Sequence, residues 1–240
     1  MYKDSFNEDY FENIDTEHKA YWLGFLMADG CVLETVYRNG ERIPATLQIA
    51  LGIQDIEIIK RFKKDISLNK EIITGFHRNP TNNTETEHCK ITAGSRKMCS
   101  DLVKHGCTPR KSLTLKFPNT VPDNLIRHFI RGYFDGDGSV WYSERMQLKK
   151  GRHKPTLQKN FRGAFQGTVD FLTEVKKNLE NNDMSIGGIR KGHGNIFTFE
   201  FGARQTMINF YHYLYDDATI YLERKHYKFV DTFNYLDMAY

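Results

Sequence analysis

The pattern of apolar and polar residues predicts helices and strands in one order, and that order occurs twice along the chain. Residues 17–29 form an apolar segment behind Thr16, a residue type that often caps helix N-termini. A strand over 31–37, a hairpin turn at 38–41 and a return strand over 46–53 follow. The return strand alternates apolar with small or polar side chains, which predicts a sheet with one buried face and one face that meets a ligand.

Apolar residues at helical spacing predict a helix that begins after Asp55. The same spacing recurs 113 residues later, after Thr168. The matching apolar positions are Ile58, Ile59, Phe62 and Ile66, then Phe171, Leu172, Val175 and Leu179. Further strands are predicted near 71–78, 88–93, 139–148, 160–166, 186–190 and 196–201, and further helices over 96–105, behind Asp123, and over 204–215 and 219–236. The expected fold is α+β, with two pseudo-twofold-related αββαββα repeats at 17–118 and 119–240, behind a polar lead-in over 1–16.

One stretch occurs in both repeats. Residues 21–31 read YWLGFLMADGC, and residues 129–139 read FIRGYFDGDGS. Each copy has a Gly inside an apolar helical segment, five residues before an Asp. Glycine in a helix interior costs about 1 kcal/mol relative to Ala and is useful where another backbone comes close. Gly24 and Gly132 are therefore predicted to be contact points between two helices, and the Gly after each Asp is predicted to be a helix C-cap.

These helices would end at Asp29 and Asp137, where the negative end of the helix dipole disfavours a carboxylate. If the two helices pack side by side, two such anions come together. A divalent cation would relieve the repulsion, and Mg²⁺ takes one or two carboxylates together with phosphate oxygens of a substrate. The repeated stretch therefore predicts a metal site at the two helix ends.

Both stretches resemble the LAGLIDADG motif of homing endonucleases, in the single-chain form with two motifs. Residues 22–30 and 130–138 match the nine motif positions, and the resemblance covers most of the chain because the order of elements repeats as well. One departure is Met27, where the family often has an acid and the second copy has Asp135. The essential motif acid is present in both copies. The resemblance implies a saddle-shaped DNA-binding sheet, with the motif helices at the repeat interface.

The resemblance also implies a function. It leads us to expect a monomeric, metal-dependent endonuclease that makes a double-strand break in a long DNA target by phosphodiester hydrolysis, in the course of intron homing. Two or three divalent ions would be held by Asp29 and Asp137 and by the backbone carbonyls of Ala28 and Gly136. Mg²⁺ is the expected cofactor, with Ca²⁺ or Mn²⁺ as substitutes in crystals.

Further catalytic residues follow from the same resemblance. Each family repeat has a Lys near the metal pocket that balances charge and helps to activate water, and these positions fall on Lys111 and Lys225. The family also often has a polar residue two positions before the cap of the second helix, which in the second repeat is Gln166. The first repeat has Ile53 there, so the two half-sites are expected to be chemically unequal.

The charge distribution favours a nucleic-acid partner. The net charge is only +4, but residues 1–17 hold six acids and one Lys, which leaves +9 on residues 18–240. Residues 145–162 carry seven basic groups and no acid, directly after a predicted metal carboxylate. A charge run is usually a solvated surface, but in this position it predicts contacts with phosphates.

The residues expected to contact DNA follow from counting in twos from each motif Asp, from the return strands and from the basic run, because a two-stranded ribbon fits the major groove and alternate side chains share a face. They are Thr35, Tyr37, Asn39, Thr46 and Gln48 in the first repeat, and Ser143, Arg145, Gln147, Lys149, Lys150, Arg152, Asn160 and Arg162 in the second. The alternation of 160–166 differs in phase from that of 47–53, which leads us to expect a β-bulge.

Two other functions use the same fold. One is an RNA maturase, an intron-splicing cofactor whose partner is the host intron RNA, and the other is a DNA-binding protein that does not cleave. Asp29 and Asp137 favour an enzyme, because a pure binding protein does not need two carboxylates facing phosphates. An intein is not expected, since the chain has no terminal nucleophile and no His-Asn end.

Composition indicates the cellular location and the state of the cysteines. No apolar run approaches the roughly 20 residues of a membrane span, and the polar start of the chain is unlike a signal peptide. The protein is therefore expected where its target DNA lies, in the cytoplasm or an organellar matrix, and not to be secreted. The four cysteines show no CxxC pair, which indicates reduced thiols and not a zinc site.

Overall fold

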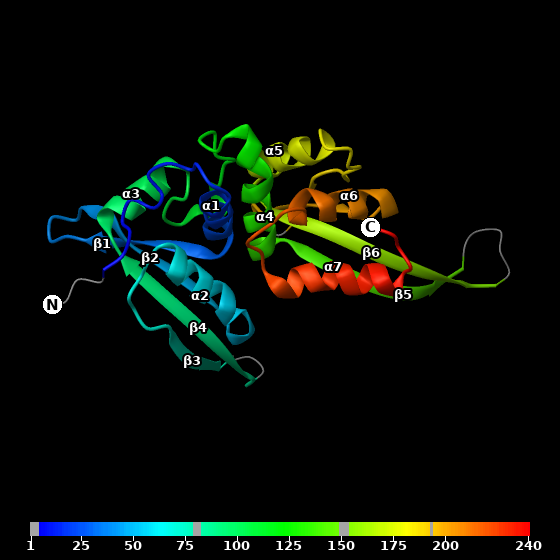
Figure 1. The fold of residues 1–240 in the computed structure, drawn as a ribbon, viewed down its shortest axis with the longest axis horizontal. Helices are drawn as coiled ribbons and strands as arrows, with labels where there is room; N and C mark the ends of the chain where they lie inside the picture. The colour runs from blue at the N-terminus through cyan, green and yellow to red at the C-terminus, as the bar shows by residue number, and fades with distance from the viewer. Residues whose placement is uncertain (1–4, 79–82, 149–153, 193) are drawn as a thin grey trace. The chain divides into compact units, whose positions relative to one another are not determined.

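The computed structural model describes residues 5–78, 83–148, 154–192 and 194–240 (Figure 1). The chain divides into two units. Unit 1 comprises residues 1–137 and 218–222, and unit 2 comprises residues 138–217 and 223–240. Both motif helices belong to unit 1 and pack against each other within it.

Unit 1 contains a four-stranded antiparallel sheet in the order β1-β2-β4-β3. Its elements are α1 (Glu17–Asp29), β1 (Gly30–Val36), β2 (Arg42–Gly52), α2 (Ile56–Asp65), β3 (Ile73–Arg78), β4 (Glu85–Gly94), α3 (Arg96–Lys104) and α4 (Ile126–Asp137). Short 3₁₀ turns occupy 53–55, 111–113 and 123–125.

Unit 2 repeats this sheet, with the order β5-β6-β8-β7. Its elements are β5 (Ser139–Gln147), β6 (Thr156–Gly167), α5 (Val169–Glu180), β7 (Arg190–Lys191), β8 (Phe197–Phe201), α6 (Arg204–Tyr215) and α7 (Glu223–Tyr235). The same strand order in both sheets confirms the predicted α+β repeat. The repeat boundary near residue 118 stays a prediction, because the two units are divided by compactness and not by internal similarity.

Each sheet has one face against helices, as the alternation predicted. In the first sheet Leu47, Ile49 and Ile91 are at most 2% exposed. In the second, the ring of Phe161 meets Phe229 of α7, and that of Phe165 meets Phe210 of α6, with ring centroids 5.5 and 5.9 Å apart. Burial identifies the inner face of the first sheet and the aromatic contacts that of the second, so the residues that alternate with them lie on the opposite, open face.

Two of the predicted helix caps are confirmed by hydrogen bonds. The side chain of Thr16 accepts from the backbone N–H of Lys19, and that of Thr168 accepts from Phe171, both at 3.3 Å. Asp55 stands at the N-cap of α2, but its side chain makes no capping hydrogen bond. The reason is local: the 3₁₀ turn before α2 gives Asp55 φ −103° and ψ 16°, far from the extended backbone of a capping residue.

The sequence-based boundaries differ from the structure by up to four residues, and two of these differences change an element of the second repeat. The strand expected over 186–190 is reduced to Arg190–Lys191. The last helix begins at Glu223 and not at Thr219, because residues 218–222 lie in unit 1 as a non-helical segment, which we call the strap. Outside the segments left undescribed, no helix is both long and apolar enough to cross a bilayer.

The segment before α1 contributes to the core of unit 1, although its sequence showed mainly its polarity. Tyr10, Phe11 and Ile14 are buried, and the carbonyl of Phe11 lies 2.8 Å from Nε2 of His105. Two of its acids contact one cation, because Lys97 lies 3.2 Å from Asp9 and 3.1 Å from Glu12 and also contacts Asp101 of α3.

Candidate active site and nucleic-acid interface

The two motif helices pack backbone to backbone at their glycines. A methyl group on Gly24 would lie 2.0 Å from the carbonyl oxygen of Phe129 in α4, and one on Gly132 would lie 1.9 Å from that of Tyr21 in α1. No side chain fits at either position without separating the helices. The predicted contact role of both glycines is confirmed.

The close packing continues to the C-terminal ends of the helices. A methyl group on Gly136 would lie 2.3 Å from Cβ of Ala28 and 3.3 Å from Oδ2 of Asp29. Asp29 is half-buried and Asp137 is exposed. Burial raises the pKa of the Tyr133 phenol, and the charges of Asp137 and Asp29 raise it further. Because Gly136 directly precedes Asp137, its close approach to Asp29 places the two predicted metal ligands at a common end of the helix pair.

This end of unit 1 suits a hard cation. Neither α1 nor α4 has a basic residue in its last turn, so the helix dipoles and the carboxylates of Asp29 and Asp137 act in the same direction. Within the described ranges no three His, Cys, Asp or Glu side chains form a metal-binding cluster. Two carboxylates with oxygens from backbone and substrate are nevertheless a set that Mg²⁺ accepts. The carbonyls of Ala28 and Gly136 belong to the residues directly before these acids.

Gly30 caps α1, but not for the expected reason. Its φ of −78° and ψ of 153° are extended, whereas the glycine cap we predicted uses the left-handed region. A methyl group at Gly30 would lie 2.7 Å from the carbonyl oxygen of Leu26. Crowding against the preceding turn, and not backbone handedness, is therefore what excludes a side chain here.

The two predicted lysines make equivalent contacts, each within its own unit. Lys111 is buried and donates to the backbone carbonyl of Gly30, the residue after Asp29. Lys225, also buried, donates to the carbonyl of Gly138 at 2.5 Å. Gly138 is the residue after Asp137. The structure thus supports the pairing of these lysines by position, and their catalytic role stays a prediction.

A cavity of about 260 Å³ opens beside Lys225 in unit 2, lined by Gly138, Ser139, Val140, Arg224, Lys225 and Lys228. Three of these six residues are cationic, and they lie on the first turns of α7. Arg224 and Lys228 were not among the predicted site residues. The available signal was helical spacing, since Lys228 lies three positions after Lys225 and four after Arg224, where side chains are neighbours on a helix.

Gln166 is exposed on the open face of the second sheet, where it pairs with Thr198. Strand register gives its counterpart in the first sheet. Cys31 pairs with Gln48 and Ser139 pairs with Ala164, so the position two residues further is Ala50 in one sheet and Gln166 in the other. Ile53, the counterpart chosen from the helix spacing, lies in the 3₁₀ turn instead. The first repeat has no polar side chain at either position, so the predicted inequality of the half-sites stays open.

The open face of the first sheet carries some of the predicted DNA contacts. Thr46 and Gln48 pair with Leu33 and Cys31 of β1, and Thr35 lies two residues further along. A register shift between Leu33 and Glu34 marks a β-bulge, which places the expected irregularity in the first hairpin. In the second, β5 and β6 pair continuously from 139 to 147.

Two predicted contacts of the first hairpin are already engaged. The hydroxyl of Tyr37 accepts from Arg96, whose guanidinium lies 5.4 Å from the ring centroid. Asn39 lies in the turn, where its side-chain oxygen accepts from the backbone N–H of Glu41 at 3.0 Å. β1 ends at Val36, so counting in twos does not place Asn39 on a strand face, and its contact with DNA stays a prediction.

The second hairpin places the remaining predicted residues on one face. Ser143 pairs with Asn160 and Gln147 with Thr156, while Arg145 pairs with Gln158 and Arg162 with Trp141. Arg162 also forms an ion pair with Glu200 of β8 at 3.0 Å, so part of its charge is compensated. Lys149, Lys150 and Arg152 lie outside the described residues.

The sequence analysis missed the third strand of the first open face. Thr92 pairs with Gln48 and Lys90 pairs with Ala50, which brings both onto the face of the predicted DNA contacts. The signal was present, because Cys89, Ile91 and Ala93 alternate with polar neighbours as the residues of β2 do. The predicted contacts were drawn only from the hairpin after each motif acid and from the basic run, which excluded β4.

Comparison with known proteins gives matches at the level of structure. No family model matches the sequence, and no curated protein matches it. The LAGLIDADG meganuclease I-AabMI bound to uncleaved DNA is similar, with 13% identity and a TM-score of 0.60 over 93% of this chain and 91% of that one. The I-LtrWI homing endonuclease bound to target DNA has 12% identity and a TM-score of 0.59, over 96% of this chain and 92% of that one. I-SmaMI bound to cleaved DNA has 12% identity and a TM-score of 0.56, over 91% of this chain and 88% of that one. Over more than nine tenths of its length, the chain has the fold of the single-chain LAGLIDADG homing endonucleases.

Proposed function

We propose that the protein is a divalent-metal-dependent endonuclease that makes a site-specific double-strand break in DNA. The proposal rests on one observation: two carboxylates, Asp29 and Asp137, end two helices whose backbones are in contact at Gly24 and Gly132. A protein that only binds DNA gains nothing from two acids at the negative ends of packed helices. The solved structures of this fold include I-SmaMI with an uncleaved DNA target in the presence of calcium ions.

In this proposal, separate residues bind the metal, orient the water and position the DNA. Asp29 and Asp137, with the carbonyls of Ala28 and Gly136, would hold Mg²⁺, which when bound polarises a phosphate oxygen and lowers the pKa of water. Lys111 and Lys225 supply positive charge that balances the phosphate. Gln166 orients water through its side-chain amide. The open sheet faces position the duplex, with Arg145, Gln147 and Gln48 suited to base edges in the major groove.

The test uses a plasmid that carries the genomic locus flanking the coding element, with the element itself removed. With Mg²⁺ the wild-type protein should linearise it, and Asp29→Asn or Asp137→Asn should abolish double-strand cleavage. DNA binding should persist or tighten in both variants, because a carboxylate that repels phosphate is lost. Asp170→Asn, which removes an exposed carboxylate from α5, is the matched control and should cleave normally.

Two results would overturn the proposal. Full cleavage by either active-site variant would remove the assigned role of that acid. Tight binding of the plasmid by the wild-type protein without any nick, with Mg²⁺ or Mn²⁺ present, would identify a binding protein. Binding of the intron transcript in preference to the DNA would favour the maturase.

A further inference from the structure

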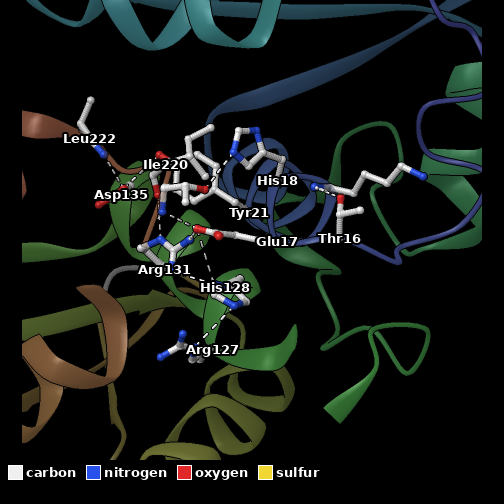
Figure 2. A network of polar contacts seen from close by, with 12 residues as sticks. Thr16, Glu17, His18, Tyr21, Arg127, His128, Arg131, Asp135, Ile220 and Leu222 are labelled. Carbon is white, nitrogen blue, oxygen red and sulfur yellow. Dashed lines mark hydrogen bonds and ion pairs between the residues drawn. The ribbon is translucent and has the colours of Figure 1, made fainter. Parts of the chain in front are cut away.

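The strap, residues 218–222, is bound to the motif helices by charged side chains (Figure 2). The backbone N–H of Thr219 donates to Glu17 at 2.8 Å, and its hydroxyl lies 3.0 Å from Nε2 of His18. The carbonyl of Ile220 accepts from Nε of Arg131 at 2.9 Å. Backbone groups of a short non-helical segment are thus bound by side chains of α1 and α4.

Arg131 is the centre of this arrangement. It is fully buried, lies 2.6 Å from Glu17 and 2.8 Å from Nδ1 of His128, and stacks its guanidinium 5.5 Å from the ring of Tyr21. A buried guanidinium is costly unless its donors are satisfied. Its contacts with Glu17, His128 and the strap satisfy donors on all three nitrogens, so a loss of the strap would leave a buried donor without its acceptor.

Asp135 binds the end of the strap that leads to α7. Its Oδ2 accepts from the backbone N–H of Leu222 at 2.7 Å and from the hydroxyl of Tyr21 at 2.9 Å. The side chain of Asp135 is fully buried. Leu222 is the last strap residue, and Lys225 follows three residues later. The carboxylate therefore fixes the backbone immediately before the helix that carries the second predicted active-site lysine.

The first repeat supports its lysine differently. Met27 occupies the motif position of Asp135 and is 2% exposed. A methyl group on Gly106 would lie 3.4 Å from Cε of Met27, and the thiol of Cys107 lies 3.7 Å from the carbonyl of Leu26. The segment that leads to Lys111 is thus packed by apolar contacts and a weak thiol donor, with no carboxylate at the equivalent motif position.

We propose that Asp135 is a positioning residue for Lys225, and that it acts through the backbone of the strap on the half-site of the second repeat only. The inference rests on the proposed endonuclease function. It accounts for an acid at this motif position in one copy and a methionine in the other. Groups that hold a catalytic residue in place commonly contribute about 10- to 100-fold to its activity when removed.

The experiment measures the nicking rate of each DNA strand separately, with the two strands of the target duplex carrying different end labels. Lys225→Met first identifies the strand that the second half-site cuts. Asp135→Met, which copies the residue of the first repeat, should slow that same strand by about tenfold or more. The other strand should stay within about twofold of wild type, so that nicked DNA accumulates.

Three controls separate positioning from general stability. Asp135→Asn keeps an acceptor for the N–H of Leu222 but loses the charge, so it should slow the Lys225-dependent strand selectively, by a smaller factor than Asp135→Met does. Tyr21→Phe removes the other donor to Asp135 and should leave the ratio of the two rates unchanged. Met27→Leu changes the equivalent site of the first repeat and should also leave that ratio unchanged. All rates are taken at saturating protein, after circular dichroism has confirmed folding.

Each outcome decides one question. Wild-type protein that nicks neither strand rejects the proposed function. Wild-type protein that cuts both strands, while Asp135→Asn and Asp135→Met slow them equally or not at all, rejects the positioning role and leaves the endonuclease in place. If Asp135→Met fails to fold, the strand ratio of Asp135→Asn decides: a selective slowing of the Lys225-dependent strand supports the inference, and an unchanged ratio rejects it.

Discussion

His128 of α4 and His18 of α1 have opposite electrostatic environments, although both belong to the same network of unit 1. Burial and the charge of Arg131 lower the pKa of His128 to about 4, against a partial opposing effect of Glu17. The hydrogen bond to Asp65, at 2.7 Å, raises the pKa of His18 above its ordinary value. One imidazole is therefore kept neutral in the fold, and the other is favoured as a cation.

This contrast predicts an acid-sensitive fold. The folded pKa of His128 lies below the unfolded value of 6.5, so its contribution to stability is complete above pH 6.5 and is lost as the pH falls toward 4. The loss should reach up to about 3 kcal/mol. Urea unfolding of wild type and His128→Gln at pH 7, 5.5 and 4.5 measures it.

The variant should lose less stability than wild type over this interval. His18→Gln is the control, because a raised pKa stabilises the fold at low pH, and its removal should steepen the loss. An equal pH dependence in wild type and His128→Gln would show that His128 does not carry the effect.

At the scale of elements, the helices and strands with a clear apolar period were predicted well from the sequence, and the segments that connect them were predicted poorly. The ends of α1 and α6 and the strand order of both sheets follow from apolar spacing, because burial of one face dictates that spacing. The strap could not be predicted, since its structure depends on Glu17, Arg131 and Asp135, which are distant in sequence. The lysine contacts were placed by resemblance, and periodicity alone would not have found them.

The contact between α1 and α4 at Gly24 and Gly132 can be tested without DNA. Gly132→Ala should lower the stability of the protein by roughly 1–3 kcal/mol or more, because the added methyl group meets the carbonyl of Tyr21 at 1.9 Å and backbone cannot yield. Gly188→Ala is the matched control, since no atom lies within 4 Å of its added methyl group. Thermal unfolding compares them, and equal melting temperatures would mean that α1 and α4 do not pack at this glycine.

The open face of the second sheet can be tested with two cations on paired strands. Arg145 of β5 lies on that face, whereas Lys159 of β6 lies on the opposite one, 3.8 Å from Glu144 and 4.8 Å from the ring centroid of Tyr235. Arg145→Ala should cost about 1–3 kcal/mol in affinity for the true site and relax discrimination at one base pair. Lys159→Ala should change neither, as measured by binding to a panel of single-base-pair variants.

One result would contradict the assignment of the open face as the DNA-binding surface. If Lys159→Ala weakens binding as much as Arg145→Ala and neither alters base preference, the helix-covered side of the sheet, or no sheet face at all, contacts the DNA.

At the scale of the whole molecule, the charge is divided between an acidic start and a basic remainder. Residues 18–240 carry +9. The basic run of 145–162 contributes seven positive charges, which predicts DNA binding that weakens steeply with salt.

Replacing Lys149, Lys150 and Arg152 with Ala should flatten the slope of log affinity against log salt by up to roughly 3, at about 0.9 for each phosphate contact. The matched control removes three lysines from α2 and α5: Lys60, Lys64 and Lys177, all exposed. Both variants lose the same net charge, so only a local contact separates their slopes. Identical slopes would mean that the run acts through net charge and touches no phosphate.

The strap also has a consequence for how the protein is made. Unit 1 requires Thr219, which binds Glu17 across 202 residues of chain. During synthesis α1 and α4 therefore emerge long before the strap, whose backbone binds their buried charged side chains. Until the strap is translated, the guanidinium of Arg131 lacks its hydrogen bond to the carbonyl of Ile220. Contacts of such long sequence separation slow folding. The first unit to leave the ribosome is thus among the last to be completed, and its maturation depends on a piece of chain translated after most of the second unit.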